Sequence, residues 1–252
     1  MDLIKRLIIF TTLILILALL SIYWPYITGK LVLNKEDTYY QKESAILKSV
    51  VDGDTIKVIL NNKEEIIRLL GINTPEKKNP YSGEATNFLK QFENSSIELL
   101  RDKEDVDKYN RKLRYIFYND RILNVEILEN GFATSFMIKG LKYEEKLRIA
   151  EDFARNNKIG LWKESKDICA KCIKLIKLDP FEDYFIIKNI CNFECDLKGW
   201  LVKDDANHFI KLSYLQAGQE QTFQSEKEIW NDNGDRFFMR DKNGDVVIFY
   251  EY

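Results

Sequence analysis

The stretch IIRLLGINTPE, residues 66–76, decides the fold of this chain. Its continuous apolar run is typical of a buried strand, yet Arg68 lies inside the run and the run stops at Asn-Thr-Pro-Glu. A core-facing strand that holds an arginine close to Glu76 indicates a site at the end of the strand. The first residue of this turn is Asn73, whose side-chain amide is neutral, whereas the carboxylate of an aspartate would carry a charge.

The segments around this strand predict a small β barrel. Residues 45–60, AILKSVVDGDTIKVIL, contain an Asp-Gly turn between two β-rich runs, which is a hairpin signal. Two more strands are predicted at 97–100 and 111–118, and helices at 83–94, 124–131 and 142–157. Five strands with a few helices in about 120 residues favour a mainly β domain with helices, a five-stranded, partly closed barrel of the OB type.

After residue 164 the sequence changes to short strand-like runs separated by turn signals, at 184–190, 199–205, 208–212 and 236–252. This pattern predicts a small antiparallel β-sandwich of the immunoglobulin-like class. We therefore expect a barrel domain at 45–164, a cysteine-containing linker at 165–177 and a sandwich at 178–252. Within the last run, DKNGD is predicted to be a hairpin turn rather than a calcium loop.

The N-terminal residues 7–27, LIIFTTLILILALLSIYWPYI, carry no charge and are long enough to cross a bilayer as a helix. Lys5 and Arg6 precede them, so residues 1–28 predict a single-pass membrane anchor with the rest of the chain extracytoplasmic, after a tether at 29–44. The alternative is a cleaved signal peptide and a secreted protein, but the bulky residues that follow offer no small-residue cleavage site.

The net charge of −2 is unevenly distributed. Residues 181–252 hold 8 basic and 14 acidic side chains, net −6, and the remaining residues hold 30 and 26, net +4. Neither part binds nucleic acid by charge alone, and contact with a phosphate backbone is expected only in the N-terminal part. His208, the single histidine, lies outside the barrel, which argues against nuclease chemistry based on a histidine.

Four cysteines, Cys169, Cys172, Cys191 and Cys195, form the pairs CAKC and CNFEC. Their spacing could hold a tetrathiolate zinc ion. Because the predicted anchor places them outside the cytoplasm, where disulfides persist, two disulfides that tie the linker to the sandwich are favoured. The pairing stays open.

Three fragments together suggest phosphodiester hydrolysis: VVDGDTIKV at 50–58, RLLGINTPE at 68–76 and DKYNRKLRYIF at 107–117. That reaction requires neutralised phosphoryl oxygens and an activated water. A hard cation on oxygen ligands with a nearby carboxylate base supplies much of this, and arginine binds phosphoryl oxygens bidentately. Each fragment alone is a weak signal, whereas their joint order and spacing are specific.

In that order the fragments resemble the staphylococcal (micrococcal) nuclease family, calcium-dependent nucleases on an OB fold, over roughly residues 44–164. The resemblance implies that Ca²⁺ is bound by Asp54, Asn73 and the backbone carbonyl of Thr74, with Asp52 in the outer coordination sphere. It also implies that Glu76 activates water, that Arg68 and Arg111 stabilise the transition state, and that Lys108 and Tyr109 contact a substrate phosphate. Asn73 departs from the aspartate of the best-known members, so weaker calcium binding is expected.

Residues 178–252 resemble the lamin-tail domain. The residues that carry the resemblance are Ile186–Asn189, Leu197-Lys198-Gly199-Trp200, Asp204, Phe209, Trp230-Asn231 and Gly234-Asp235. The resemblance implies an immunoglobulin-like sandwich with an attachment or partner-binding role and with Trp200 and Trp230 in its core. The whole sequence thus predicts a membrane-anchored, calcium-dependent endonuclease that cleaves DNA and RNA with low sequence specificity. The alternative is a catalytically silent OB-fold protein that binds nucleic acid at the cell surface, which only Asn73 favours.

Overall fold

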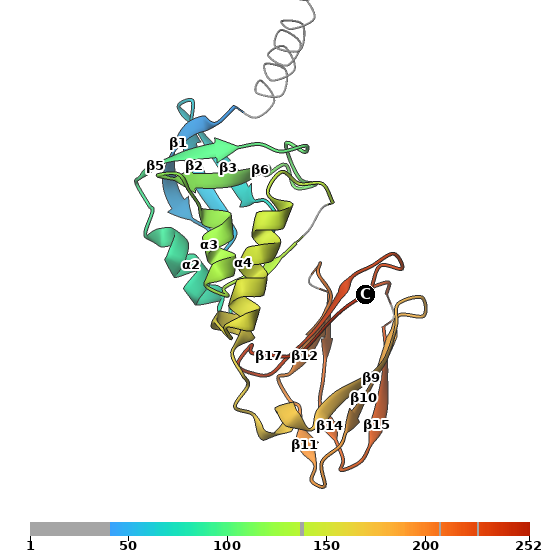
Figure 1. Ribbon diagram of the computed structural model, residues 1–252. Coiled ribbons are helices and arrows are strands. Elements are labelled where there is room, and N and C mark those ends of the chain that lie inside the picture. The colour runs from blue at the N-terminus through green and yellow to red at the C-terminus, as the bar shows by residue number, and fades with distance from the viewer. Residues whose placement is uncertain (1–40, 137–138, 207, 226) are drawn as a thin grey trace, which may run out of the picture. The chain divides into compact units, whose positions relative to one another are not determined.

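The computed structural model describes residues 41–136, 139–206, 208–225 and 227–252 (Figure 1). The apolar span predicted at 7–27 lies outside these residues. Within the described ranges, no helix is both long enough and apolar enough to cross a membrane. Residues Glu43–Tyr252 form one compact unit, which contains a β barrel with helices followed by further antiparallel β sheets.

The barrel consists of five strands, as predicted: β1 (Glu43–Val50), β2 (Thr55–Leu60), β3 (Lys63–Leu69), β5 (Ser96–Leu100) and β6 (Lys112–Tyr118). Antiparallel pairs run in the order β3-β2-β1-β5-β6, and a parallel pair between β3 and β6 closes the barrel. The β2–β3 hairpin turns at Asn61 and Asn62, both with positive φ, as the preferred two-residue hairpin requires. The closed five-stranded barrel fits the OB fold.

Three helices lie side by side against the barrel (Figure 1): α2 (Ser82–Lys90), α3 (Leu123–Glu129) and α4 (Glu144–Asn156). They are the three helices that the sequence predicted; α2 and α3 begin one residue earlier than predicted, α4 begins two residues later, and all three end earlier. Buried Asn124 of α3 joins helix to barrel, because its Oδ1 accepts from the Ile116 amide at 2.9 Å and its Nδ2 donates to the Leu70 carbonyl at 2.8 Å. Three pieces were not predicted: β4 (Ile72–Asn73) with its partner β8 (Thr134–Ser135), and β7 (Arg121–Ile122) at the edge of β6.

The C-terminal part is all β apart from two short 3₁₀ turns, η1 (Gly160–Trp162) and η2 (Ile168–Lys171). Its strands form a sheet in the order β15-β10-β9, a sheet in the order β13-β12-β16-β17, and a small β11–β14 pair. Their bounds are β9 (Ile173–Asp179), β10 (Tyr184–Asn189), β11 (Cys195–Asp196), β12 (Leu201–Lys203), β13 (Phe209–Lys211), β14 (Tyr214–Leu215), β15 (Glu220–Gln224), β16 (Arg236–Arg240) and β17 (Val246–Glu251).

The core of this part lies between the two larger sheets. Phe185 from β10 meets Phe237 from β16 with ring centroids 5.3 Å apart, and Trp230 packs on both rings. Trp200 and Trp230 are each 1% exposed, which confirms that they are core residues. DKNGD is the β16–β17 turn, in which Asp241 accepts hydrogen bonds from the amides of Asn243 and Asp245.

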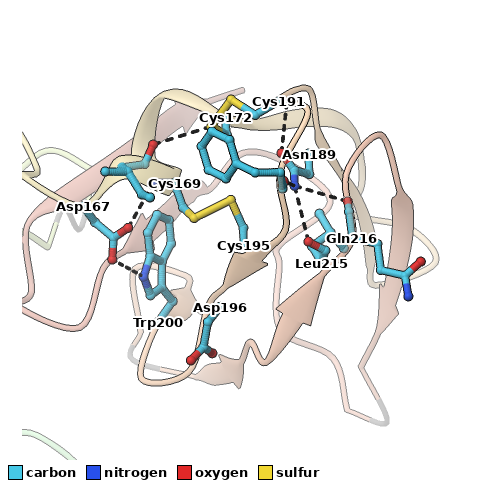
Figure 2. Close-up of a disulfide and its surroundings, with 12 residues drawn as sticks. Asp167, Cys169, Cys172, Asn189, Cys191, Cys195, Asp196, Trp200, Leu215 and Gln216 are labelled. Carbon is cyan, nitrogen blue, oxygen red and sulfur yellow. Dashed lines mark hydrogen bonds between the residues drawn. A yellow bond between two sulfur atoms is a disulfide. The ribbon is translucent and has the colours of Figure 1, made fainter.

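Two disulfides, Cys169–Cys195 and Cys172–Cys191, fasten η2 to the sheets (Figure 2). The Cα atoms of the two pairs are 5.6 Å and 5.2 Å apart, which is the usual separation in a disulfide. The prediction of two disulfides in place of a zinc site is thus confirmed, and the structure supplies the pairing that spacing left open. Beside them, the Trp200 Nε1 donates to Asp167 at 3.4 Å.

Strand β16 is buried on both of its faces. Phe237 and Met239 point into the core between the two sheets, whereas Phe238 packs on the other side against Ala154 of α4 and Trp162 of η1. The four-stranded sheet is therefore covered by the barrel part on its second face. This contact, which joins the two β-rich parts, was not predicted from the sequence.

Candidate active site

One hollow of about 720 Å³ collects every catalytic, metal and substrate residue that the sequence predicted. The β1–β2 turn supplies Asp52 and Asp54, β3 supplies Arg68, and the loop before β6 supplies Lys108, Tyr109 and Arg111, while Asn73, Thr74 and Glu76 come from β4 and the turn after it. The closed barrel brings the three fragments together, because β2 pairs with β3 and β3 pairs with β6.

Asp54 is the centre of a dense hydrogen-bond network. Its Oδ2 accepts from the Thr74 amide at 3.1 Å and from the Thr74 hydroxyl at 2.9 Å, and it lies 3.2 Å from Nη2 of Arg68. Its Oδ1 accepts from the Thr55 hydroxyl at 3.1 Å. The Asp54 carboxylate is therefore fixed in position before any ligand binds.

Gly53 lets the turn that carries the two aspartates approach this network. A Cβ added at Gly53 would lie 2.5 Å from Cβ of Ala85 and 2.8 Å from the Thr74 hydroxyl. Both distances are shorter than van der Waals contact, so the DGD motif requires glycine between its aspartates for reasons of space. The sequence predicted only a hairpin turn at this position and did not predict the close approach of Gly53 to Ala85 and Thr74.

Asp52 and Asp54 place two carboxylates next to one another, and the Asp54 amide donates to Oδ1 of Asp52 at 3.1 Å. Burial raises the pKa of Asp52, and the neighbouring Asp54 charge raises it further. Like charges held together in this way indicate a position that a cation stabilises.

Arg111 is held by Asp107, a residue that the sequence interpretation did not select. Nε and Nη2 of Arg111 each lie 2.7 Å from Oδ2 of Asp107, while Oδ1 of Asp107 accepts from the Tyr109 and Arg111 amides at 2.9 Å. Burial raises the pKa of Asp107, but these hydrogen bonds outweigh it and leave the pKa below its ordinary value. An aspartate that bonds amides two and four residues onward is a turn signal that could have been read from DKYNR.

Tyr109 is 69% exposed at the rim of the hollow. The Lys108 ammonium lies 5.2 Å and the Arg111 guanidinium 5.5 Å from the centroid of its ring. A cationic, aromatic rim of this kind suits a phosphate-bearing chain that carries bases.

Asn73 uses both ends of its amide. Its Oδ1 accepts from Nη2 of Arg68 at 2.9 Å, and its Nδ2 donates to the backbone carbonyl of Asp205 at 2.7 Å. Asp205 belongs to the loop after β12, and Ala206 of the same loop lines the hollow. An aspartate at position 73 would have no proton to donate, so the C-terminal part gives a physical reason for the amide.

The donors that would hold a metal are two carboxylates, the Asn73 amide oxygen and the Thr74 carbonyl. Oxygen-only donors suit a hard cation such as Ca²⁺, and the adjacent carboxylates described above supply the negative charge. Among the described residues, no three His, Cys, Asp or Glu side chains gather as a metal cluster. The binding of a hard cation here would therefore depend on the Asn73 amide oxygen and the Thr74 backbone oxygen as well as on the carboxylates.

Known proteins are similar to this chain. The family model described as "Staphylococcal nuclease homologue" matches residues 66–164. A thermonuclease from Staphylococcus intermedius is 34% identical over 158 residues, which cover 60% of this chain and 94% of that protein. A thermonuclease from Staphylococcus hyicus is also 34% identical, over 45% of this chain and 72% of its own length.

The endonuclease YncB from Bacillus subtilis (strain 168) is 34% identical over 129 residues, which cover 47% of this chain and 61% of that protein. The family model therefore covers β5, β6 and the three helices of the barrel part, together with Arg68, Glu76 and Arg111 of the hollow. Barrel topology, the convergence of the three fragments on one hollow, and near full-length similarity to a thermonuclease agree with one another. This chain belongs to the staphylococcal nuclease family.

Proposed function

We propose that this protein is a calcium-dependent endonuclease that hydrolyses phosphodiester bonds of DNA and RNA with low sequence specificity. Family membership supports a hydrolytic nuclease, and relatives are named thermonuclease and endonuclease. The observation that carries the proposal is the placement of Arg68, Glu76, Arg111 and the Asp54 network around one hollow. A protein that only binds nucleic acid has no need of a carboxylate base beside two arginines.

In the proposed mechanism, Asp54, Asn73 and the Thr74 carbonyl would hold a calcium ion, and Asp52 would lie in the outer coordination sphere. When bound, the ion neutralises charge on the phosphoryl oxygens. Glu76 accepts a proton from the attacking water as the water oxygen bonds to phosphorus and the bond to the leaving oxygen breaks. Arg68 and Arg111 donate to the remaining phosphoryl oxygens, whose charge rises in the transition state.

The rim residues complete the proposed substrate site. Lys108 and Tyr109 contact a phosphate of the same strand, at the exposed edge of the hollow. Contacts to phosphate carry no base information, which fits a nuclease of low sequence specificity.

We also propose that the C-terminal sheets form a lamin-tail-like, immunoglobulin-like sandwich that serves attachment or partner binding. Two antiparallel sheets that share a core support this architecture. An anchor at residues 1–28 with an extracytoplasmic nuclease is part of the same proposal. The two disulfides support it, because disulfides persist in oxidising compartments.

The test is cleavage of labelled single-stranded DNA by the full chain, in millimolar calcium and in chelator. We expect cleavage only with calcium, loss of cleavage in Glu76→Ala, and none of that loss in Glu84→Ala, which removes an exposed carboxylate from α2. Binding without cleavage at every calcium concentration would refute the enzyme and support a silent OB-fold binder.

A further inference from the structure

A second, smaller cavity of about 80 Å³ adjoins the candidate active site. Pro75 and Glu76 line both spaces. Most of the remaining wall comes from the C-terminal part, including Lys203 at the end of β12 and Arg240 at the end of β16. The cavity thus lies between the predicted catalytic base and two cations that family membership does not explain.

Both cations are buried, and each has a nitrogen without a hydrogen-bond partner in the part of the chain that the structure describes. Lys203 is 2% and Arg240 7% exposed, and neither Nζ of Lys203 nor Nε of Arg240 has a partner among the described residues. Burial, followed by the charge of Arg240, lowers the pKa of Lys203 to about 7. Burial likewise lowers the pKa of Arg240 to about 10. Asp205 and Asp204 favour the charged form of Lys203, and Glu151 favours that of Arg240. Among the described residues these carboxylates form their ion pairs with His208 and Arg236 and with neither of the two cations, although buried cations are normally paired.

Neighbouring charges do not provide the missing partner. Arg236, the third cation beside the Phe238 ring, is already paired with Glu151, whose Oε2 lies 2.7 Å from its Nη1. Asp241 lines the cavity, but its oxygens accept from the Ser165 hydroxyl at 2.6 Å and from two turn amides.

The Phe238 ring stabilises the two cations only in part. Nζ of Lys203 lies 4.7 Å and the Arg240 guanidinium 5.8 Å from the ring centroid. A cation–π contact attracts the charge but makes no hydrogen bond to it. Nζ of Lys203 and Nε of Arg240 therefore keep unmet hydrogen-bonding capacity in the wall of the cavity.

We propose that Lys203 and Arg240 form a subsite for a terminal phosphate group of the nucleic acid on which this protein acts. Guanidinium and ammonium donors together suit the oxygens of a phosphate monoester. A volume of about 80 Å³ holds a small tetrahedral anion, whereas sites for whole organic ligands measure about 300–1,000 Å³. A nucleotide would therefore place its phosphate in the cavity and its sugar and base in the hollow beyond Glu76. This inference rests on the proposed nuclease function for its source of phosphate.

The first experiment measures the thermal midpoint of the full chain, in detergent and chelator, during titration with inorganic phosphate against sodium chloride of equal ionic strength. At ten times the dissociation constant, bound phosphate raises the midpoint by about 3–6 °C. We expect the rise to saturate and to disappear in Lys203→Met and in Arg240→Met. The exposed lysine variant Lys198→Met should keep it.

The same titration in Arg111→Ala removes a phosphate contact in the candidate active site, and the rise should survive there. The unliganded Lys203→Met protein should melt at or above the wild-type temperature, because it loses an unpaired buried charge. A rise that is absent in the wild type, or that persists in both methionine variants, would overturn the subsite. This experiment requires no cleavage, so its failure is distinct from failure of the nuclease assay.

The second experiment compares short DNA oligonucleotides with 5′-phosphate, 3′-phosphate or two hydroxyl ends. We expect one phosphorylated end to lower KM about tenfold in the wild type and to lose that advantage in Lys203→Met. A saturable thermal shift without any preference for phosphorylated ends would assign the cavity to free phosphate and overturn the assignment to nucleic acid.

Discussion

Replacing Asn73 by aspartate tests how the C-terminal part and the metal site share one side chain. The change removes the 2.7 Å hydrogen bond from Nδ2 to the Asp205 carbonyl and places two oxygens opposite one another. A lost partner in a partly buried site costs about 1–3 kcal/mol, while the ion pair gained with Arg68, 2.9 Å away, returns part of that. We expect a net destabilisation of about 1–2 kcal/mol in chelator, which lowers the midpoint by about 2–8 °C.

Calcium should reverse the sign of this effect, because an added ligand charge strengthens the site, by about tenfold in Kd or more. Thermal unfolding in chelator and calcium titration calorimetry measure the two effects separately. Asn79→Asp, which adds the same charge on the same loop without a contact to Asp205, is the matched control. A variant that is as stable as the wild type in chelator would show that the contact with Asp205 does not stabilise the protein.

Three further outcomes follow from contacts in the same molecule. Arg111→Ala should lower kcat by about 10²–10³, and near wild-type cleavage would refute its role. Asp107→Asn should also lower kcat, but by less, because Arg111 loses its anchor. Because the pKa of Asp107 is lowered, the anchor stabilises the fold above the ordinary carboxyl pKa and is lost as the pH falls through the lowered value. The kcat–pH profiles of the wild type and of Asp107→Asn would reveal this difference. Removing one disulfide with the pair Cys172→Ala and Cys191→Ala should cost about 2–4 kcal/mol, seen as a lower denaturant midpoint, and an unchanged midpoint would contradict it.

The sequence predicted those features that depend on local pattern. The barrel strands and the three helices have clear periodicity, and the nuclease fragments keep a specific order, so the barrel and the meeting of these fragments in one hollow were predicted. Asp107 and Ala206, which also line the hollow, were not. The two-residue strands β4 and β8 are too short for any periodic signal. The disulfide pairing was open because spacing alone does not decide connectivity.

Other features depend on residues that are distant in sequence. Asn73 and Asp205 are 132 residues apart, and nothing in either segment indicates that they meet. The RFFMR run of β16 was predicted to be a strand, but its charged residues give no sign that the barrel part covers them. Contacts of this kind come from packing between the two β-rich parts, and only the three-dimensional structure reveals them.

The double burial of β16 also limits how this protein can be divided. In the whole chain Glu151 is 3% exposed and is neutralised by Arg236, a cation that a barrel cut off near residue 164 would lose. It would also expose Trp162 and Ala154, which Phe238 covers in the whole chain. The C-terminal sheet therefore forms an outer wall of the barrel part, because Glu151, Ala154 and Trp162 of the barrel part all contact β16.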